Sequence, residues 1–496
     1  MAGQKKPWYR IRNIILAFVL LIVVMVGWQV IFALTARPGA PRDVNPDLRR
    51  IVETYAPEGV EPGQGQEIIA ELKPVLDDIE KDLQERFDPD DLVSMSFRRG
   101  DDGRPVLTEA GAERLRLFDE NGGPEIVERL TNEPSLGMRH MDGLLLEILL
   151  PELGATRRLA RVLGSQMTVA ATAGDFEAAA ARLDDLLHLA ELVSQQPVLI
   201  SHLVGWAIVD LGLNELRTIM TEHDLTTAQC ERFVAVMDRR LPLPSPVMAI
   251  EGERLVFQQI ADVTHTDDGR GSGRFLLSEL GNLEMTMGAS PPTLGGAARI
   301  VNMAHIVMPS KKETLDLANE HYDGYAELFE MPRSKRDAKV AELEAFIQQR
   351  DLRMRLLQVM LPALGRVADT YDGIQMRIDG TRVMLAIEAR HAATGAYPDD
   401  LDALTPTYID DLPNDPYSGQ TFGYRRLNAP DAATGATGYL LWSAGFDGES
   451  NDGTPVLVEE YDDDGNESMA VSNSSALNRD NAETDFILNL PRQYEE

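Results

Sequence analysis

The chain reads MLAIEARHAATGAYPDDLDALTPTYIDDLPNDPYSGQTFGYRRL over residues 384–427 and GYLLWSAGFDGESNDG over residues 438–453. This order predicts a helix, two Pro- and Gly-rich turns, two strands and a loop rich in Gly and Asp. Successive side chains of a strand point to opposite faces, so Tyr439 and Ser443 are expected on one face of the second strand. Val456 and Val458 suggest a third strand. The stretch therefore predicts a small α+β domain, with an antiparallel sheet packed on a helix.

This succession of G-x-Y-P, P-x-D-P-Y-S-G, two strands and S-x-G-x-D-G resembles the C-terminal domain of the major pseudopilin of type II secretion. The resemblance covers about the last quarter of the chain. It implies that the final loop holds a calcium ion, an ion that takes roughly six to eight oxygen ligands from a flexible loop. The expected ligands are side-chain oxygens and, from the strand, backbone or hydroxyl oxygens: Asp447, Asn451, Asp452, Leu441 and Ser443. The alternative is a Gly- and Asp-rich turn that binds no metal.

The composition of the chain is strongly acidic. It has 80 Asp and Glu against 47 Lys and Arg, for a net charge of -33. Binding to nucleic acid requires clustered Lys and Arg, so we exclude nucleic acid as a partner. A second acidic stretch, residues 462–467, lacks the spacing of an EF-hand loop and is expected to form a solvated hairpin turn. The single cysteine, Cys230, excludes an intramolecular disulfide and is expected to be buried in a helix over residues 225–237.

Residues 13–34 contain no charged side chain and are long enough to cross a hydrocarbon core of about 30 Å. Four basic residues precede this segment and only Arg37 follows it closely: Lys5, Lys6, Arg10 and Arg12. The excess of positive charge on one side predicts a cytoplasmic N-terminus and an extracytoplasmic body. A cleaved signal peptide is the alternative, but the apolar run exceeds the usual length of about 7–15 residues. We therefore expect an uncleaved, single-pass anchor in the inner (cytoplasmic) membrane, with the lipid bilayer as its partner.

Helical periodicity dominates the middle of the chain, most strongly over residues 151–240. Four helices are expected there. Gly174 ends the first, Asp175 caps the second, Pro197 lies in the first turn of the third, and Thr226 or Thr227 caps the fourth. The piece G-D-F-E-A-A resembles the second helix of a tetratricopeptide repeat. The sequence holds one such hairpin, whereas a solenoid needs about three.

Further helices are expected over shorter segments: residues 48–55, 66–83, 106–119, 124–131, 297–307, 311–330 and 333–349. A long helical pattern over residues 351–394 is interrupted by Pro362 and Gly380, and residues 264–275 and 283–297 are expected to be loops. The predicted fold class is mainly α, and its parts are a cytoplasmic basic segment (1–12), a transmembrane helix (13–34), a linker (35–65), an extracytoplasmic region of helical hairpins (66–350), and a stem helix with the pseudopilin-like α+β domain (351–496).

No arrangement of residues typical of a catalytic site or an organic cofactor site stands out. The histidines form neither an H-E-x-x-H motif nor a Cys/His cluster. The favoured hypothesis is a non-catalytic envelope protein, a scaffold or assembly component linked to secretion or pilus-like machinery, with other envelope proteins as partners. A second hypothesis is an anchored enzyme whose site lies among His188, His202, Glu251 and Arg254. A third is a peptide-binding adaptor made of helical repeats.

Overall fold

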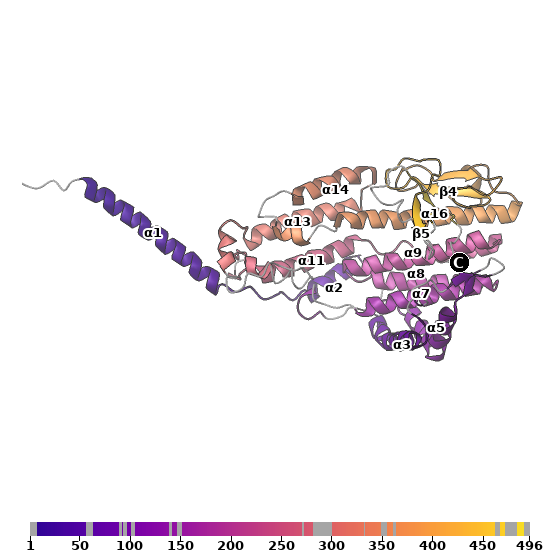
Figure 1. Cartoon of the computed structure of the whole chain (residues 1–496), viewed down its shortest axis with the longest axis horizontal. Helices are drawn as coiled ribbons and strands as arrows, with labels where there is room; N and C mark the ends of the chain where they lie inside the picture. The colour runs from indigo at the N-terminus through magenta and orange to yellow at the C-terminus, as the bar shows by residue number, and fades with distance from the viewer. Residues whose placement is uncertain are drawn as a thin grey trace, which may run out of the picture.

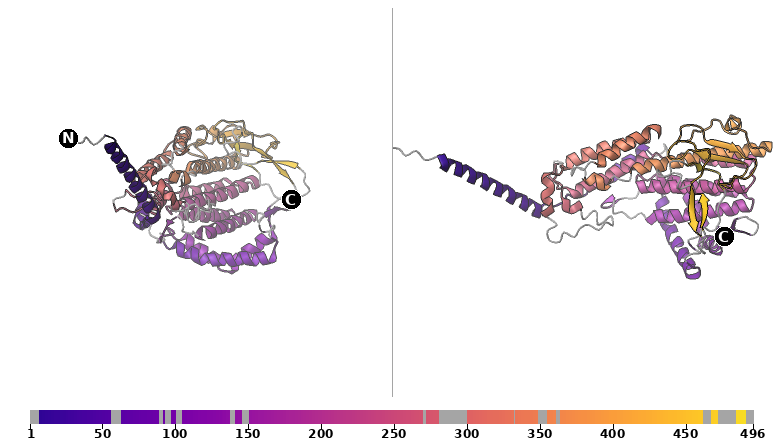
Figure 2. Two further views of the ribbon diagram at one scale, coloured as in Figure 1. Left: turned by 60° about the vertical axis from the view of Figure 1, so that its left-hand side comes forward. Right: turned by 45° about the horizontal axis from the view of Figure 1, so that its top comes forward.

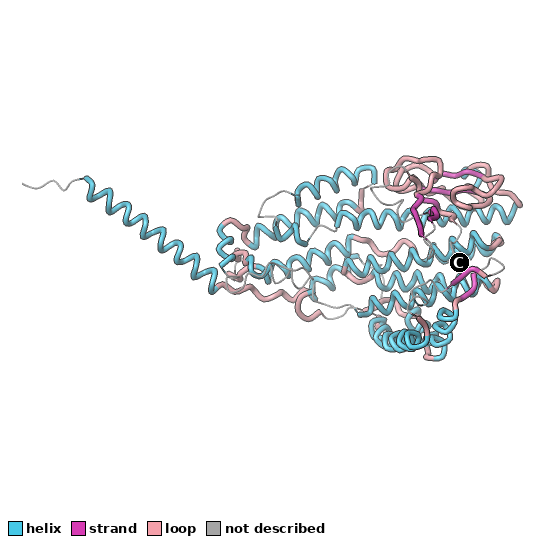
Figure 3. The backbone as a smooth tube through the Cα atoms, in the orientation of Figure 1, coloured by secondary structure: helices cyan, strands magenta, loops and turns pink. Residues whose placement is uncertain are grey.

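The computed structural model describes residues 7–55, 63–88, 92, 97–100, 105–137, 141–145, 151–269, 272–280, 300–331, 333–348, 355–360, 364–461, 467–471 and 484–490. The protein is mainly helical, with small antiparallel sheets, as the sequence predicts. The apolar helix α1 (Pro7–Thr35) projects away from an elongated helical body (Figure 1). Strands occupy a small part of the body (Figure 3).

The N-terminal part of the body is built from short elements. They are α2 (Asn45–Tyr55), α3 (Gly65–Arg86), β1 (Phe97–Arg99), β2 (Pro105–Leu107), α5 (Glu109–Glu120) and α6 (Gly123–Thr131). The segment expected to link the membrane helix to the body therefore contains a helix, α2, that begins three residues earlier than predicted. The β1–β2 pair is antiparallel and was not predicted.

The centre of the body consists of long helices. They are α7 (Pro151–Thr172), α8 (Phe176–Ser194), α9 (Leu199–Glu222), α10 (Thr227–Arg240) and α11 (Val247–Thr264). The predicted starts of α8 and α10 are confirmed, whereas Pro197 precedes α9 instead of lying in its first turn. The Asp175 side chain accepts a hydrogen bond from the backbone N–H of Ala178, and Thr226 forms a capping box with Gln229. Such caps satisfy backbone donors that the first turn of a helix leaves free.

The chain then returns through a second set of helices. They are η3 (Ile300–Ile306, a 3-10 helix), α13 (Lys311–Leu328), α14 (Arg333–Gln348), α15 (Arg355–Met360) and α16 (Leu364–Thr394). The predicted interruption at Gly380 is wrong, because α16 passes through it without a break. A Cβ atom at Gly380 would lie 2.5 Å from Leu488, so the glycine allows the C-terminal segment to approach the helix closely. The loop predicted over residues 283–297 lies outside the described residues.

The elements stack in layers from α3 through α7, α8, α9 and α16 to the C-terminal sheet (Figures 1 and 2). One hydrophobic cluster runs through all of these layers, from Ile68 in α3 to Leu488 beyond the last strand. Trp206 and Phe233 are among its largest fully buried side chains. Each such side chain stabilises the fold by roughly 1.5–3 kcal/mol relative to an exposed one. The C-terminal sheet therefore shares its core with the helices.

The C-terminal sheet has the strand order β3 (Gly423–Arg426), β4 (Tyr439–Ser443) and β7 (Phe486–Ile487), all antiparallel. The predicted alternation along β4 is confirmed, because Tyr439 and Leu441 join the main core while Leu440 and Trp442 join a separate cluster on the other face.

The strand suggested by Val456 and Val458 exists but pairs elsewhere. It is β5 (Leu457–Tyr461), and its partner is β6 (Glu467–Val471) rather than β4. The hairpin turn expected over residues 462–467 falls between these strands, and residues 462–466 lie outside the described part of the chain. The third strand of the main sheet is instead β7, whose two residues carry too short a pattern to be recognised in the sequence.

Candidate functional site

The predicted calcium ligands lie at the end of β4 and in the loop that follows it. Leu441 and Ser443 are buried in the strand, whereas Asp447 and Asp452 are exposed and Asn451 is half-buried. Asp452 has a positive φ of 56°, a left-handed conformation that Asp and Asn tolerate better than most other residues. The structure therefore places the three loop residues at the surface and the two strand residues in the interior.

A carboxylate outside the predicted set, Asp415, organises the start of this loop. It is fully buried and accepts hydrogen bonds from the Ser443 hydroxyl at 2.8 Å, from the backbone N–H of Ala444 at 2.9 Å and from that of Tyr417 at 3.1 Å. A buried carboxylate needs such donors to offset the loss of hydration. Asp415 belongs to the P-x-D-P-Y-S-G motif, so the motif builds a turn and also fixes the end of β4.

A second buried carboxylate, Asp485, holds the other end of the loop. It accepts hydrogen bonds from the backbone N–H groups of Asn451 at 3.0 Å, Gly453 at 2.8 Å and Thr454 at 3.2 Å. Burial raises the pKa of Asp485, and the nearby charge of Asp447 raises it further. This part of the loop thus turns its N–H groups toward a negative charge that the protein itself supplies. Nothing in the local sequence around Asp485 signals this role.

Hydrogen bonds within the fold engage the predicted ligands on the strand and in the loop, where Asp447 accepts one from the backbone N–H of Glu449 at 2.9 Å. The backbone carbonyl of Leu441 accepts a hydrogen bond from Leu488, and the Ser443 hydroxyl is donated to Asp415. Within the described residues, no group of three or more His, Cys, Asp or Glu side chains is arranged to hold a metal ion. Among the five predicted ligands, only Asp447, Asn451 and Asp452 have side chains that reach the surface.

Arg333, from the helical body, binds the start of the same loop. The guanidinium of Arg333 at the start of α14 lies 4.4 Å from the ring centre of Tyr417 and 4.6 Å from that of Phe446. It also donates to the backbone carbonyl of Phe446 at 3.2 Å and to the Asp372 carboxylate at 3.1 Å. Asp372 is bound by Arg336 as well. Cation–π contacts of a desolvated guanidinium are worth about 2 kcal/mol, so this cluster joins α14, α16 and the loop.

The residues proposed for an enzymatic site do not form one cluster. His188 on α8 contacts Glu191 at 3.1 Å and Arg240 at 2.8 Å. Glu251 and Arg254 form an ion pair at 2.9 Å on α11. Each of these groups is thus engaged in a structural contact between or along helices.

His202 is fully buried in α9, and burial lowers its pKa to about 4. Neither ring nitrogen makes a well-formed hydrogen bond within the described residues, although the backbone of Gln196 opposes part of the effect of burial on the pKa. The ring instead packs edge-on against Trp206, with 6.3 Å between ring centres. These contacts describe a neutral core histidine.

Two buried glutamates have strongly shifted pKa values that the sequence did not signal. Burial raises the pKa of Glu253 on α11 to about 7, and its side chain accepts a weak hydrogen bond from the backbone of Leu199 at 3.4 Å. Burial also raises the pKa of Glu388 on α16 to about 7, although a hydrogen bond with Tyr439 opposes the shift. Glu253 thus faces the start of α9, and Glu388 faces β4.

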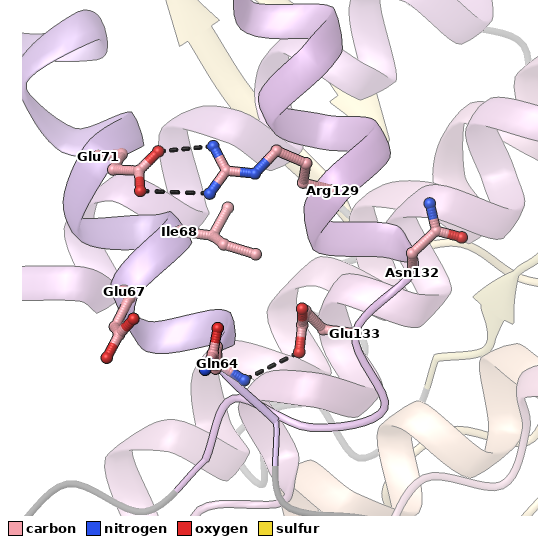
Figure 4. A pocket seen from close by; sticks show the side chains of 7 residues that line it. All are labelled: Gln64, Glu67, Ile68, Glu71, Arg129, Asn132 and Glu133. Atoms are coloured by element: carbon pink, nitrogen blue, oxygen red, sulfur yellow. Dashed lines mark hydrogen bonds and ion pairs between the residues drawn. The ribbon is translucent and has the colours of Figure 1, made fainter.

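Two of the hollows in the described surface lie between pairs of helices. One, of about 290 Å³, lies between α3 and α6, where Arg129 binds Glu71 at 2.6 Å and Glu133 accepts a hydrogen bond from the backbone of Gln64 (Figure 4). The other, of about 260 Å³, lies between α10 and α16 and includes Cys230 on its wall. Cys230 is 1% exposed, which supports the predicted role as a buried apolar residue, and burial raises the pKa of its thiol to about 12. Neither hollow contains a residue of the enzymatic hypothesis.

No family model matches this chain, and no curated protein or solved structure matches it either. The resemblance to the pseudopilin domain therefore rests on the quoted motifs alone.

Proposed function

We propose that the chain is a membrane-anchored, non-catalytic scaffold or assembly component of the cell envelope. Its N-terminus lies in the cytoplasm, and the helical body extends from the other side of the inner membrane. The C-terminal sheet is then displayed at the end of the body opposite to α1 (Figure 1). The observation that carries this proposal is the exposure of α1.

Within the described part of the chain, no other element covers the apolar helix at the N-terminus over most of its length. None of the residues in its most apolar window is buried within the protein. The second helix that is long and apolar enough to cross a bilayer, α9, is 61% buried over the corresponding window, which identifies it as a core helix. Exposed apolar surface of this size is stable in hydrocarbon and not in water.

The predicted link to secretion or pilus-like machinery is supported by the elements of the C-terminal part. A long helix, α16, underlies the sheet, and the motif residues form turns and two strands, β3 and β4, in the predicted order. The core shared with the helical body holds this unit in one orientation toward partners. The adaptor and enzyme hypotheses gain no comparable observation from the described residues.

We further propose that calcium stabilises the C-terminal loop through Asp447, Asn451 and Asp452. The charge of Asp447 acts on the buried Asp485 and raises the pKa of its carboxyl group. A cation held by the exposed carboxylates offsets that repulsion and so favours the folded loop. A ligand that binds only the folded state raises its stability in proportion to the logarithm of its concentration.

The anchor is tested by alkaline extraction of membranes from cells that produce the full chain or a variant without residues 1–35. Retention of the full chain in the membrane and release of the variant are expected. Protease added to intact spheroplasts should digest the body. Release of the full chain by alkali would refute the anchor, and a protected body would refute the orientation.

The calcium proposal is tested by thermal unfolding with calcium and with excess chelator, for the wild type and for the double variant Asp447→Ala, Asp452→Ala. A rise in midpoint that the double variant loses is expected. Asp399→Ala serves as the control, because this side chain is 88% exposed and lies outside the loop. An equal response of all three proteins would contradict the proposal.

The assembly role requires that an envelope protein co-purifies with the crosslinked full chain, and failure to recover any would count against it.

A further inference from the structure

The end of the body next to α1 carries a second apolar feature. Ile306 is the last residue of η3 and Val307 follows it; each is 59% exposed, more than any other large apolar side chain of the described residues outside α1. They are adjacent in sequence, and no described element covers them. Exposed apolar side chains that lie next to one another can contact an apolar surface such as lipid or another protein.

The last turn of α1 packs directly against this helix. Ala33 is 1% exposed, and the ring of Phe32 lies 4.3 Å from the ring of His305 between centres. The apolar segment of α1 ends at about the same point, since Thr35 and Arg37 follow. Because a helix rises about 1.5 Å per residue, η3 lies within about one turn of the end of the membrane-crossing segment.

The connection between α1 and the body is also fixed. The backbone N–H of Gly39 donates to the carbonyl of His265 at 2.8 Å. Arg42 binds the buried carboxylate of Asp262 at 2.8 Å, and Lys311 binds the same carboxylate at 2.6 Å. Burial opposes the charge of Asp262, but the hydrogen bonds from Arg42 and Lys311 outweigh it and lower the pKa of this carboxyl. These contacts join the segment that follows α1 to α11 and to the start of α13.

We propose that Ile306 and Val307 insert into the outer surface of the same bilayer that α1 crosses. This inference rests on the proposed anchor. The headgroup layer on each side of the hydrocarbon core is about 5–8 Å thick, which matches the distance of about one helical turn from the end of the apolar segment. The body then rests on the membrane through η3 as a second contact, and its orientation to the bilayer is set by two points instead of one. The two side chains contact lipid at the boundary between the headgroups and the acyl chains.

The test uses the full chain in lipid nanodiscs, with Cys230→Ala as the background and one new cysteine labelled with an environment-sensitive fluorophore. The test position is Val307→Cys. Val24→Cys, which is 60% exposed in the middle of α1, reports on the anchor. Leu457→Cys on β5, which is 46% exposed and lies away from α1 (Figure 1), reports on surface exposure alone. Each protein is measured with lipids that carry a nitroxide near the glycerol backbone or near the end of the acyl chain.

The expected result is loss of most of the Val307 emission with the shallow nitroxide, loss of the Val24 emission with the deep nitroxide, and no loss for Leu457. Quenching of Val24 together with a Val307 signal that matches Leu457 would overturn the inference and leave the anchor standing. An unquenched Val24 would overturn the anchor and the inference with it. A blue-shifted Val307 signal that neither nitroxide quenches would show that protein, such as a second copy of the chain, covers the pair, and would also overturn the inference.

Discussion

Replacement of Arg333 by methionine is expected to loosen the C-terminal loop from the helical body. The Arg333 side chain is 6% exposed and bonded to Asp372, and its guanidinium lies over two aromatic rings. Loss of a charge-assisted hydrogen bond costs about 1.5–3 kcal/mol, and loss of the ring contacts costs up to about 2 kcal/mol. Methionine recovers part of the packing, and Asp372 keeps Arg336 as a partner. The net cost is therefore about 3 kcal/mol.

The assay is hydrogen exchange of the backbone amides of β4, read by mass spectrometry. These amides exchange through opening of the sheet, so the exchange rate follows the free energy of that opening. A cost of about 3 kcal/mol corresponds to an increase of about a hundredfold in rate. The exchange rate of the β4 amides in Arg333→Lys should lie between the rates in the wild type and in Arg333→Met, because lysine keeps the charge but cannot form the planar contacts of a guanidinium.

Arg426→Met is the matched control in the same unit. Arg426 also pairs with a carboxylate, that of Asp399 at 2.7 Å, but the two side chains are 43% and 88% exposed. Such surface pairs contribute about 0–1 kcal/mol, so the exchange rate should rise by less than about tenfold. Equal effects of Arg333→Met and Arg426→Met on β4 would refute the idea that the buried cluster fastens the sheet.

Three further substitutions test other parts of the structure. Gly252→Ala places a Cβ atom 1.7 Å from the carbonyl oxygen of Pro197 and should lower the free energy of unfolding, measured by urea titration, by about 3 kcal/mol or more. Gly154→Ala, whose Cβ atom would have nothing within 4 Å, should leave that free energy unchanged or raise it by about 0.5–1 kcal/mol. Equal effects of the two substitutions would contradict the close approach of Gly252 to Pro197. The pKa of Glu388 is about 7 in the folded chain against 4.5 for the free side chain, so the folded state holds a proton that the unfolded state releases, and stability falls as pH rises through that window. Glu388→Gln should remove this loss, which amounts to about 3 kcal/mol above about pH 7, and an unchanged pH dependence would contradict the assignment. Ser443→Ala should cost about 1–3 kcal/mol with or without calcium, because its hydroxyl is donated to a buried carboxylate, and a loss seen only with calcium would instead make it a ligand.

The helices of the central body were predictable because their signals are local. Gly174 and Asp175 mark the end of one helix and the start of the next, and both roles depend on residues within one turn. The alternation along β4 was equally readable, since the period of a strand is two residues. Gly380 was misread because its small size serves a contact with Leu488, which is distant in sequence.

The candidate loop shows the limit of the same reasoning. Its exposed acids were visible as a Gly- and Asp-rich motif, but the groups that hold it come from elsewhere. Asp485 reaches the loop from beyond the β5–β6 pair, and Arg333 reaches it from the start of α14. The sequence around Arg333 reads as an ordinary charged helix, with no periodic signal that separates a buried arginine from a solvated one. Such contacts depend on the tertiary fold and leave no local pattern.

The arrangement of these contacts favours a rigid support over a flexible tether. At one end, Phe32 and Arg42 fix α1 to the body. At the other end, Arg333 and the shared core fix the sheet to α16, whose 31 residues span about 45 Å. A tether would let the sheet explore many positions and would lose that freedom on binding a partner. A rigid support has already lost that freedom, so in the proposed anchored arrangement the sheet would meet a partner at a constant height above the membrane.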